Sequence, residues 1–129
     1  FKNARVGDVM RSGPDGPALS VNFQLEGQTF MAVNGGPQFK FNEAVSLFVN
    51  CESQAEVDEL WDKLSAGGEP GACGWLKDRF GLSWQIIPAA LGALLSDPDP
   101  GRAQRAMQAM LKMSKIDIAE LTRAAAMSD

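Results

Sequence analysis

The amino-acid sequence predicts an α+β fold in which strands make up most of the first two thirds and helices the last third. Two observations predict it. Apolar and polar residues alternate in several short segments before residue 52, with the period of two that half-buried strands show. After Ser53, apolar residues recur at spacings of three and four, which places them on one face of a helix. A chain of 129 residues is long enough for one domain with a hydrophobic core.

Three strands are expected before residue 34. They cover residues 4–11, 19–25 and 29–33. The glycines and prolines of residues 12–17 predict a turn or loop, because these residues favour the special backbone angles of turns. Glu26-Gly27-Gln28 is a tight turn that joins the second and third strands into a hairpin. The segment Asn34-Gly35-Gly36-Pro37 ends the hairpin.

The middle third predicts a strand, a helix and two returning strands. Every second residue of its first strand is apolar, namely Val45, Leu47, Val49 and Cys51. Ser53 and Glu56 form a capping box at the start of the helix. The apolar face of that helix consists of Val57, Leu60, Trp61 and Leu64. Gly67-Gly68 ends the helix, and strands over residues 74–78 and 82–87 follow.

The last third predicts three helices. A short one covers residues 88–95, and Asp97-Pro98-Asp99-Pro100 forms a linker and the start of the second. The second helix has an apolar face of Ala103, Met107, Met110 and Leu111. Ser114-Lys115-Ile116-Asp117 indicates a further cap, before a face of Ile118, Leu121 and Ala125. These faces must be buried on the sheet or on a partner chain.

Composition argues against several classes of site. The chain carries 12 basic and 16 acidic residues, a formal charge of −4, whereas a nucleic-acid-binding surface is usually basic. It contains no histidine, so neither a Ser-His-Asp triad nor a Cys-His dyad can form within it. No apolar run approaches the roughly 20 residues of a membrane-spanning helix. We therefore expect no nucleic-acid and no membrane partner.

The two cysteines indicate a reducing environment. Cys51 and Cys73 do not make a disulfide framework, and their spacing matches no zinc motif. We interpret both as small reduced residues of a cytoplasmic protein. The chain begins at Phe1, without a methionine, and an expected strand follows almost at once. We therefore expect that an N-terminal piece is missing.

Four segments carry a resemblance to a known family. They are Asn34-Gly35-Gly36-Pro37 with Phe39-Lys40-Phe41-Asn42-Glu43, Cys73-Gly74-Trp75-Leu76-Lys77-Asp78, Phe80-Gly81-Leu82-Ser83-Trp84-Gln85, and Met113-Ser114-Lys115-Ile116-Asp117-Ile118. In these segments, and in the order of its elements, the chain resembles the PhnB-like branch of the vicinal oxygen chelate fold, also called the glyoxalase/bleomycin-resistance/dioxygenase superfamily. Proteins of this branch often carry the label demethylubiquinone methyltransferase.

The resemblance implies paired βαβββ modules whose sheets curl around a cavity. Residues 1–43 would be a partial first module, whose first strand and helix precede Phe1. Residues 44–88 would be the second module and residues 89–129 the C-terminal helices, all within a single domain. The resemblance also implies a homodimer, because the open cavities of this fold are commonly completed across subunits.

The residues do not support the chemistry in the family's names. Methyl transfer from S-adenosylmethionine usually needs a glycine-rich turn between a strand and a helix. Here Gly67-Gly68 follows a helix, and Gly35-Gly36 leads into an aromatic loop. Metal-dependent members of the superfamily have a glutamate seven residues after the aspartate of an Asp-x-x-Gly turn. Seven residues after Asp78 this chain has Gln85. We therefore expect neither a metal nor a cofactor.

Two pairs of residues are the main candidates for ligand binding. Gln85, on the last strand of the module, and Ser46, on its first strand, would offer directional hydrogen bonds in an apolar pocket. The alternative is that Gln85 pairs with buried backbone. Trp75 and Trp84 are candidates for stacking on a flat ligand, with core or dimer packing as the alternative.

The loop before the module supplies the other candidates. Phe39 and Phe41 are expected to form a lid on the cavity or a seam with a partner subunit, with Asn42 beside them. Glu43 is the single carboxylate considered for acid–base catalysis, and the alternative is an ordinary surface glutamate.

These residues predict a protein that binds a small polar or aromatic metabolite in a sheet-lined cavity, without a metal. Two other functions stay open. One is a divalent-metal-dependent lyase, isomerase or dioxygenase of the same superfamily. The other is a non-catalytic dimeric interaction protein whose cavity is filled by side chains.

Overall fold

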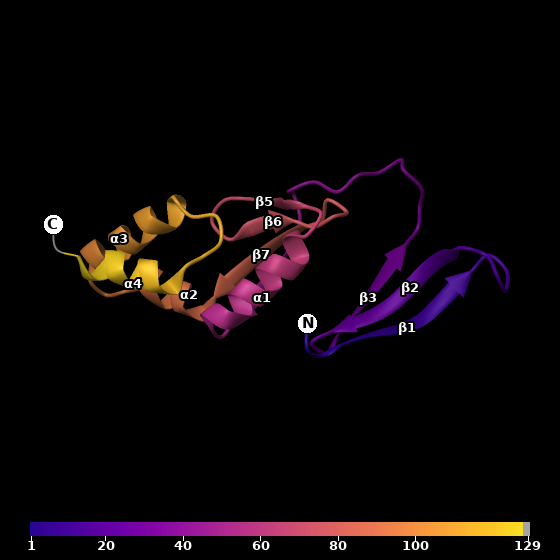
Figure 1. The fold of residues 1–129 in the computed structure, drawn as a ribbon, viewed down its shortest axis with the longest axis horizontal. Helices are drawn as coiled ribbons and strands as arrows, with labels where there is room; N and C mark the ends of the chain where they lie inside the picture. The colour runs from indigo at the N-terminus through magenta and orange to yellow at the C-terminus, as the bar shows by residue number, and fades with distance from the viewer. Residues whose placement is uncertain (128–129) are drawn as a thin grey trace. The chain divides into compact units, whose positions relative to one another are not determined.

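The computed structural model describes residues 1–127 and confirms an α+β fold. Its elements, coloured along the chain in Figure 1, are β1 (Ala4–Arg11), β2 (Ala18–Leu25), β3 (Gln28–Val33), β4 (Ser46–Cys51), α1 (Gln54–Ser65), β5 (Glu69–Pro70), β6 (Trp75–Lys77), β7 (Ser83–Pro88), α2 (Ala89–Leu95), α3 (Pro100–Leu111) and α4 (Ile118–Ala126). The chain divides into two compact units, Phe1–Lys40 and Phe41–Asp129.

The first unit is an antiparallel sheet in the order β1-β2-β3. The turn between β2 and β3 places Glu26 and Gly27 at φ 50° and 81°, the left-handed region in which glycine costs little. Phe23 and Phe30 are directly opposite in the register, and their rings stack with centroids 5.3 Å apart. None of the described residues 1–40 is fully buried, so this small sheet has no core of its own.

The second unit contains a βαβββ module, which the family resemblance implied, whereas the pattern of residues predicted only two strands after the helix. Its sheet has the order β4-β7-β6-β5, in which β4 and β7 are parallel and the other neighbours are antiparallel. The two-residue strand β5 was not expected from the sequence, because Glu69-Pro70 has no alternating pattern. Val45, expected inside the first strand, precedes β4 and is 67% exposed.

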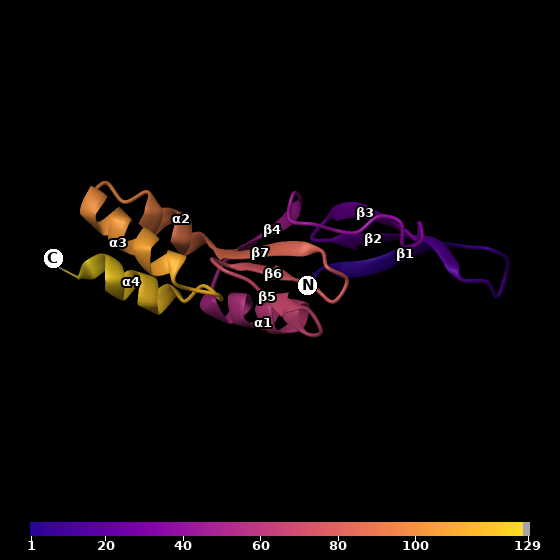
Figure 2. The ribbon, with the colours of Figure 1, turned by 90° about the horizontal axis from the view of Figure 1, so that it is seen from above.

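Helix α1 covers one face of this sheet (Figures 1 and 2). The Ser53 hydroxyl accepts a hydrogen bond from the backbone N–H of Glu56 and so caps the helix as predicted. The apolar face of α1 packs onto alternate residues of the sheet, and the buried side chains on both sides are Val57, Leu60, Trp61, Leu76, Trp84 and Ile86. Burying one such aliphatic side chain contributes about 1.5–3 kcal/mol, so this layer is a main source of stability.

The three C-terminal helices pack on one another, but the expected apolar face of α3 is only partly buried: Met107 is 40% and Leu111 61% exposed, and Ala106 is the buried residue of this helix. Helix α3 contacts both α2 and α4, and a buried cluster joins them to the end of β7 through Ile87, Leu91, Ile116 and Leu121. Asp99 caps α3 and Asp117 caps α4, each by accepting a backbone N–H with its carboxylate. The sequence left open whether these helices pack on the sheet or on a partner chain. In the fold they pack mainly on one another and on the C-terminal end of β7.

The length and apolar character of the helices bear on whether any of them could span a membrane. Within the part of the chain that the structure describes, no helix is long and apolar enough to cross a membrane.

Candidate functional site

The face of the β4-β7-β6-β5 sheet opposite α1 carries the candidate site. Side chains alternate along β7, so that Trp84 and Ile86 point to α1 while Ser83 and Gln85 point to the other side. We call this second side the open sheet face and define it by Ser46, Phe48, Asn50, Trp75, Lys77, Ser83 and Gln85.

Gln85 lies between two aromatic residues on the open sheet face. Its register partner on β6 is Trp75, and its register partner on β4 is Phe48. Trp75 is half-buried, whereas Phe48 is 58% exposed, which is unusual for a large apolar side chain in a strand. The strand pairing therefore forms a row in which one amide is flanked by two rings.

A hydrogen bond connects the two residues that the sequence selected. The side-chain nitrogen Nε2 of Gln85 donates to Oγ of Ser46 over 2.9 Å. Ser46 stands two residues before the register partner of Gln85, so the glutamine side chain leans along the sheet toward the start of β4. An amide has two N–H donors and a carbonyl acceptor. One N–H is used here, and within residues 1–127 no side chain pairs with the other N–H or with the carbonyl oxygen.

A second hydroxyl lies beside this pair. Ser83 is the register partner of Ser46, and its Oγ is buried without a hydrogen-bond partner among the described residues. Buried polar atoms in native proteins nearly always have a hydrogen-bond partner, so a buried hydroxyl without one is unusual. Next to Gln85 and Ser46, it gives the open sheet face a third polar group.

Lys77 and Glu43 form an ion pair at the end of the open sheet face. Lys77 is the register partner of Ser83, and Glu43 lies in the loop before β4. The hydrogen bond from Lys77 holds the pKa of the Glu43 carboxyl below its usual value, and the same bond raises the pKa of Lys77. A carboxylate with a lowered pKa is a weaker base, which argues against acid–base catalysis by Glu43.

The structure separates Trp84 from the other candidates. Its ring is only 7% exposed on the face that α1 covers, and its Nε1 donates to the Asp78 carboxylate over 2.9 Å. Of the two alternatives for Trp84, stacking on a ligand and packing in the core, this burial favours core packing, and Trp75 lies on the opposite face of the sheet beside Gln85. Asp78 also accepts from the backbone N–H groups of Phe80 and Leu82, so it organises the turn before β7.

The remaining candidates lie in the segment before β4. Asn42 uses its Oδ1 to accept the backbone N–H of Ala44 over 2.9 Å, which is a local turn contact. Phe41 is 62% exposed. Phe39, which belongs to the first unit, is 86% exposed. The proposed lid or seam needs such exposure, but exposure alone does not distinguish the two roles.

The groups around Gln85 fit a divalent metal ion poorly. Gln85 could offer only a neutral carbonyl oxygen, and the candidate carboxylate Glu43 is ion-paired with Lys77. Across residues 1–127, no three Cys, Asp or Glu side chains gather as a metal site would require. No chemical step through a metal is derived for these residues.

Sequence reasoning missed four members of the open sheet face, namely Phe48, Asn50, Lys77 and Ser83. Phe48 lies out of phase with the apolar positions Leu47 and Val49, and this was a readable signal because an aromatic residue on the polar phase of a strand faces away from the core. Ser83 gave no such signal, because its burial depends on neighbours that only the folded sheet brings together.

Comparison with known proteins assigns the chain to a family. A family model described as 3-demethylubiquinone-9 3-methyltransferase matches residues 1–87, which is two thirds of the 129 residues. The chain belongs to this family. No curated protein matches the sequence.

Solved structures agree with membership of the 3-demethylubiquinone-9 3-methyltransferase family. A PhnB protein from Bacillus cereus, described with the same methyltransferase name, is 29% identical over 69% of this chain and 82% of its own, with a TM-score of 0.64. A protein from Pseudomonas aeruginosa shares the fold, at 18% identity over 67% of this chain and 79% of its own, with a TM-score of 0.55. The expected PhnB-like resemblance is thereby confirmed, and the open sheet face lies inside the residues that the family model matches.

Proposed function

We propose that the open sheet face binds a small metabolite that has a flat, aromatic or conjugated part and a polar substituent. The observation that carries the proposal is the position of Gln85 between Trp75 and Phe48, with its amide bonded to Ser46. A flat ligand would contact the two rings, and its polar substituent would meet the free N–H and carbonyl oxygen of the amide.

The polar cluster favours a ligand that accepts hydrogen bonds. The hydroxyls of Ser46 and Ser83 can each donate one, and Ser83 has no other partner in the described chain. An unpaired buried hydroxyl costs about 1–3 kcal/mol. Ser83 is 1% exposed, so a ligand oxygen would recover part of that cost only if the side chains that cover Ser83 move aside. A carbonyl or hydroxyl oxygen on the flat part suits this role.

We propose binding without a metal rather than methyl transfer. The family and the Bacillus cereus protein carry a methyltransferase name. In this chain β4 leads into α1 through Glu52 and Ser53, without the glycine-rich turn with which many nucleotide cofactors are bound. The rival proposal, a divalent-metal-dependent enzyme of the vicinal oxygen chelate type, would need ligands beyond Gln85 and the ion-paired Glu43.

We also propose that the protein is a cytoplasmic homodimer. Large apolar side chains of the first unit are exposed, among them Val6 (70%), Met31 (65%) and Val33 (68%). A second copy would cover such side chains at low cost, since most soluble oligomers are symmetric homo-oligomers. The free thiols of Cys51 and Cys73 fit a reducing compartment. Native mass spectrometry tests the dimer, and a monomer at micromolar concentration would contradict it.

The binding proposal is tested with a thermal-shift screen of aromatic and polar metabolites, followed by calorimetric titration of any compound that raises the melting temperature. Phe48→Ala is expected to weaken binding about two- to tenfold, the range that one aromatic contact supplies. Phe80→Ala is the matched control, because Phe80 is 76% exposed in the turn before β7 and lies off the open sheet face.

Three results would each count against the proposal. One is a ligand that binds wild type, Phe48→Ala and Phe80→Ala equally. Another is a Gln85→Leu variant that is less stable than wild type but binds the ligand with unchanged affinity. That result would show that Gln85 stabilises the fold and does not contact the ligand. The third is a stoichiometric metal in purified protein by elemental analysis, which would favour the metal-dependent rival.

A further inference from the structure

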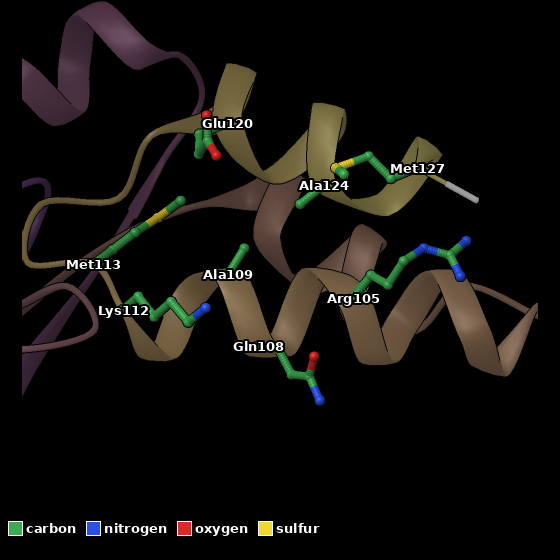
Figure 3. A pocket seen from close by; sticks show the side chains of 8 residues that line it. All are labelled: Arg105, Gln108, Ala109, Lys112, Met113, Glu120, Ala124 and Met127. Carbon is green, nitrogen blue, oxygen red and sulfur yellow. The ribbon is translucent and has the colours of Figure 1, made fainter. Parts of the chain in front are cut away.

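Away from the open sheet face, a groove of about 560 Å³ lies between α3 and α4 (Figure 3). Arg105, Lys112 and Glu120 line it together with apolar side chains. Arg105 donates to the carbonyl of Ala125, and Glu120 is ion-paired with Arg123. Since side chains of both charges line the groove, its composition selects no ligand charge. The groups of the open sheet face are more selective.

The side chain of Gln85 gives the open sheet face a donor and an acceptor side by side. One N–H of its amide is bonded to Oγ of Ser46 over 2.9 Å. No side chain of residues 1–127 pairs with the second N–H or with the carbonyl oxygen Oε1. Such an amide is complemented by a ligand that presents an acceptor next to a donor, as when glutamine pairs with two adjacent atoms of adenine.

Ser46 adds a second donor beside this amide. Its hydroxyl oxygen accepts the bond from Gln85, and the hydroxyl has a hydrogen of its own to donate. A carbonyl oxygen has two lone pairs and so accepts two hydrogen bonds. A single ligand carbonyl can therefore accept from Nε2 of Gln85 and from Oγ of Ser46, while an adjacent ligand N–H donates to Oε1 of Gln85.

Two aromatic side chains limit the thickness of such a ligand. Phe48 and Trp75 are the register partners of Gln85 on the strands at either side. Two strand spacings, about 10 Å, separate them, and side chains stand roughly perpendicular to a sheet. A flat ring that touches an aromatic ring on each side needs about 7–8 Å. One ring system therefore fits between Phe48 and Trp75, with its edge toward Gln85.

The charges at the open sheet face favour a neutral ligand. Lys77 is the one charged residue among those that define the face, and it is ion-paired with the Glu43 carboxylate. A ligand carboxylate would have to compete with Glu43 for Lys77, and it would set an acceptor against Oε1 of Gln85. A ligand cation would have to compete with Lys77 for Glu43. A neutral ligand leaves this ion pair intact.

We propose that the open sheet face selects a neutral, flat ligand with a lactam edge, that is, a ring in which an N–H and a C=O are adjacent. The lactam carbonyl accepts from Gln85 and Ser46, and the lactam N–H donates to Oε1 of Gln85. This ligand class refines the binding function proposed above for the same face and depends on it. The competing explanation is that Gln85 only joins β7 to β4 through Ser46, which predicts no preference for a lactam.

A comparison of two isosteric compounds tests the lactam edge. Carbostyril is a flat bicyclic lactam, and coumarin is the lactone of the same shape, in which a ring oxygen replaces the N–H. In calorimetric titrations of the full chain, we expect carbostyril to bind at least about tenfold more tightly, because coumarin loses one hydrogen bond and sets an acceptor against Oε1 of Gln85. Naphthoate, a flat carboxylate of similar size, is expected to bind more weakly than carbostyril.

A pair of variants links this preference to Gln85. Gln85→Met keeps the length of the side chain but removes both amide groups, so we expect carbostyril and coumarin to bind to it with equal affinity. Asn50→Leu removes an exposed amide elsewhere on the open sheet face and should keep the preference for carbostyril. Circular dichroism shows whether each variant is folded. If Gln85→Met is not, the comparison of carbostyril with coumarin on wild type still decides the question.

The results for Phe48→Ala separate the lactam proposal from the binding function on which it depends. Equal affinity of carbostyril and coumarin for wild type, tighter binding of naphthoate, or a preference that survives Gln85→Met would each overturn the lactam proposal. If carbostyril and coumarin bind equally and Phe48→Ala weakens both, the face binds flat ligands without selecting a lactam. If carbostyril binds but Phe48→Ala leaves its affinity unchanged, both proposals are wrong. If no compound binds, the lactam proposal is wrong, and the metabolite screen still tests the binding function.

Discussion

The side-chain amide of Gln85 donates to the hydroxyl of Ser46 over 2.9 Å and so joins the last strand of the βαβββ module to its first. The two residues are 39 positions apart in the chain, and the parallel pairing of β4 and β7 brings them together. The bond is part-buried, and it orients the amide that we propose as a ligand contact.

A double-mutant cycle on this pair measures the strength of the bond. We expect Gln85→Leu and Ser46→Ala each to lower the free energy of unfolding by about 0.5–1.5 kcal/mol, with a coupling energy of similar size between them. Urea denaturation of the four proteins gives the values. A coupling energy near zero would show that the bond contributes nothing to the folded state.

Asp78 is expected to be a strong determinant of stability. Its carboxylate accepts from Phe80 N–H, Leu82 N–H and the Trp84 indole. Asp78→Ala removes all three acceptor contacts, so we expect a loss of about 2–4 kcal/mol in the free energy of unfolding and a changed tryptophan emission spectrum. Asp62→Ala, at an exposed position of α1, removes the same charge and should change stability by less than about 0.5 kcal/mol.

Gly74 is expected to tolerate no side chain. Its φ is +85°, and a Cβ built there would lie 2.6 Å from Cδ1 of Ile87 and 3.1 Å from Cγ1 of Ile116. Gly74→Ala therefore combines left-handed backbone strain with overpacking, and we expect a loss of about 2–4 kcal/mol. Gly81→Ala isolates the backbone term, because Gly81 has a φ of +87° and its nearest contact is an ordinary 4.0 Å. Equal losses in the two variants, measured by thermal unfolding, would contradict the close packing.

The ion pair of Glu43 and Lys77 predicts a small dependence of stability on pH. The pKa of Glu43 is lower in the folded chain than in the unfolded one, so the pair contributes fully above about pH 4.3 and is lost as the pH falls through the lowered pKa. The pKa of Lys77 is raised, so the contribution is lost again as the pH rises through that value.

The substitution Glu43→Gln should remove both effects. Since the side chains of Lys77 and Glu43 are 39% and 59% exposed, the total change is expected to be small and to shrink further in high salt. Melting temperatures at pH 3 to 11 measure it. A large loss of stability at neutral pH in Glu43→Gln would show that Glu43 has a structural role beyond this pair.

Part of the candidate site was readable before the fold was known. The period of two along residues 82–87 places Gln85 and Trp84 on opposite faces of a strand, and the two differ in burial as that requires, with Trp84 only 7% exposed. The burial of Trp84 under α1 favours the core-packing alternative for this residue. Phe48 was also within reach, because its position on the polar phase of β4 follows from the period of two.

The sequence by itself determined the local structure of this protein. The capping residue Ser53, the turn at Gly27 and the alternating strands act through contacts within a few residues, so the pattern of side chains is sufficient to predict them. Membership of the PhnB-like family was readable for a similar reason, since its motifs are continuous segments.

Only the tertiary structure decided which distant residues meet. The pairing of Gln85 with Ser46, the row of Trp75 and Phe48 around it, and the orphan hydroxyl of Ser83 all depend on the order and register of strands. The groove between α3 and α4 depends likewise on how two amphipathic helices pack. Strand register and helix packing depend on the burial of side chains across the whole core. They therefore cannot be predicted from any short segment of the sequence.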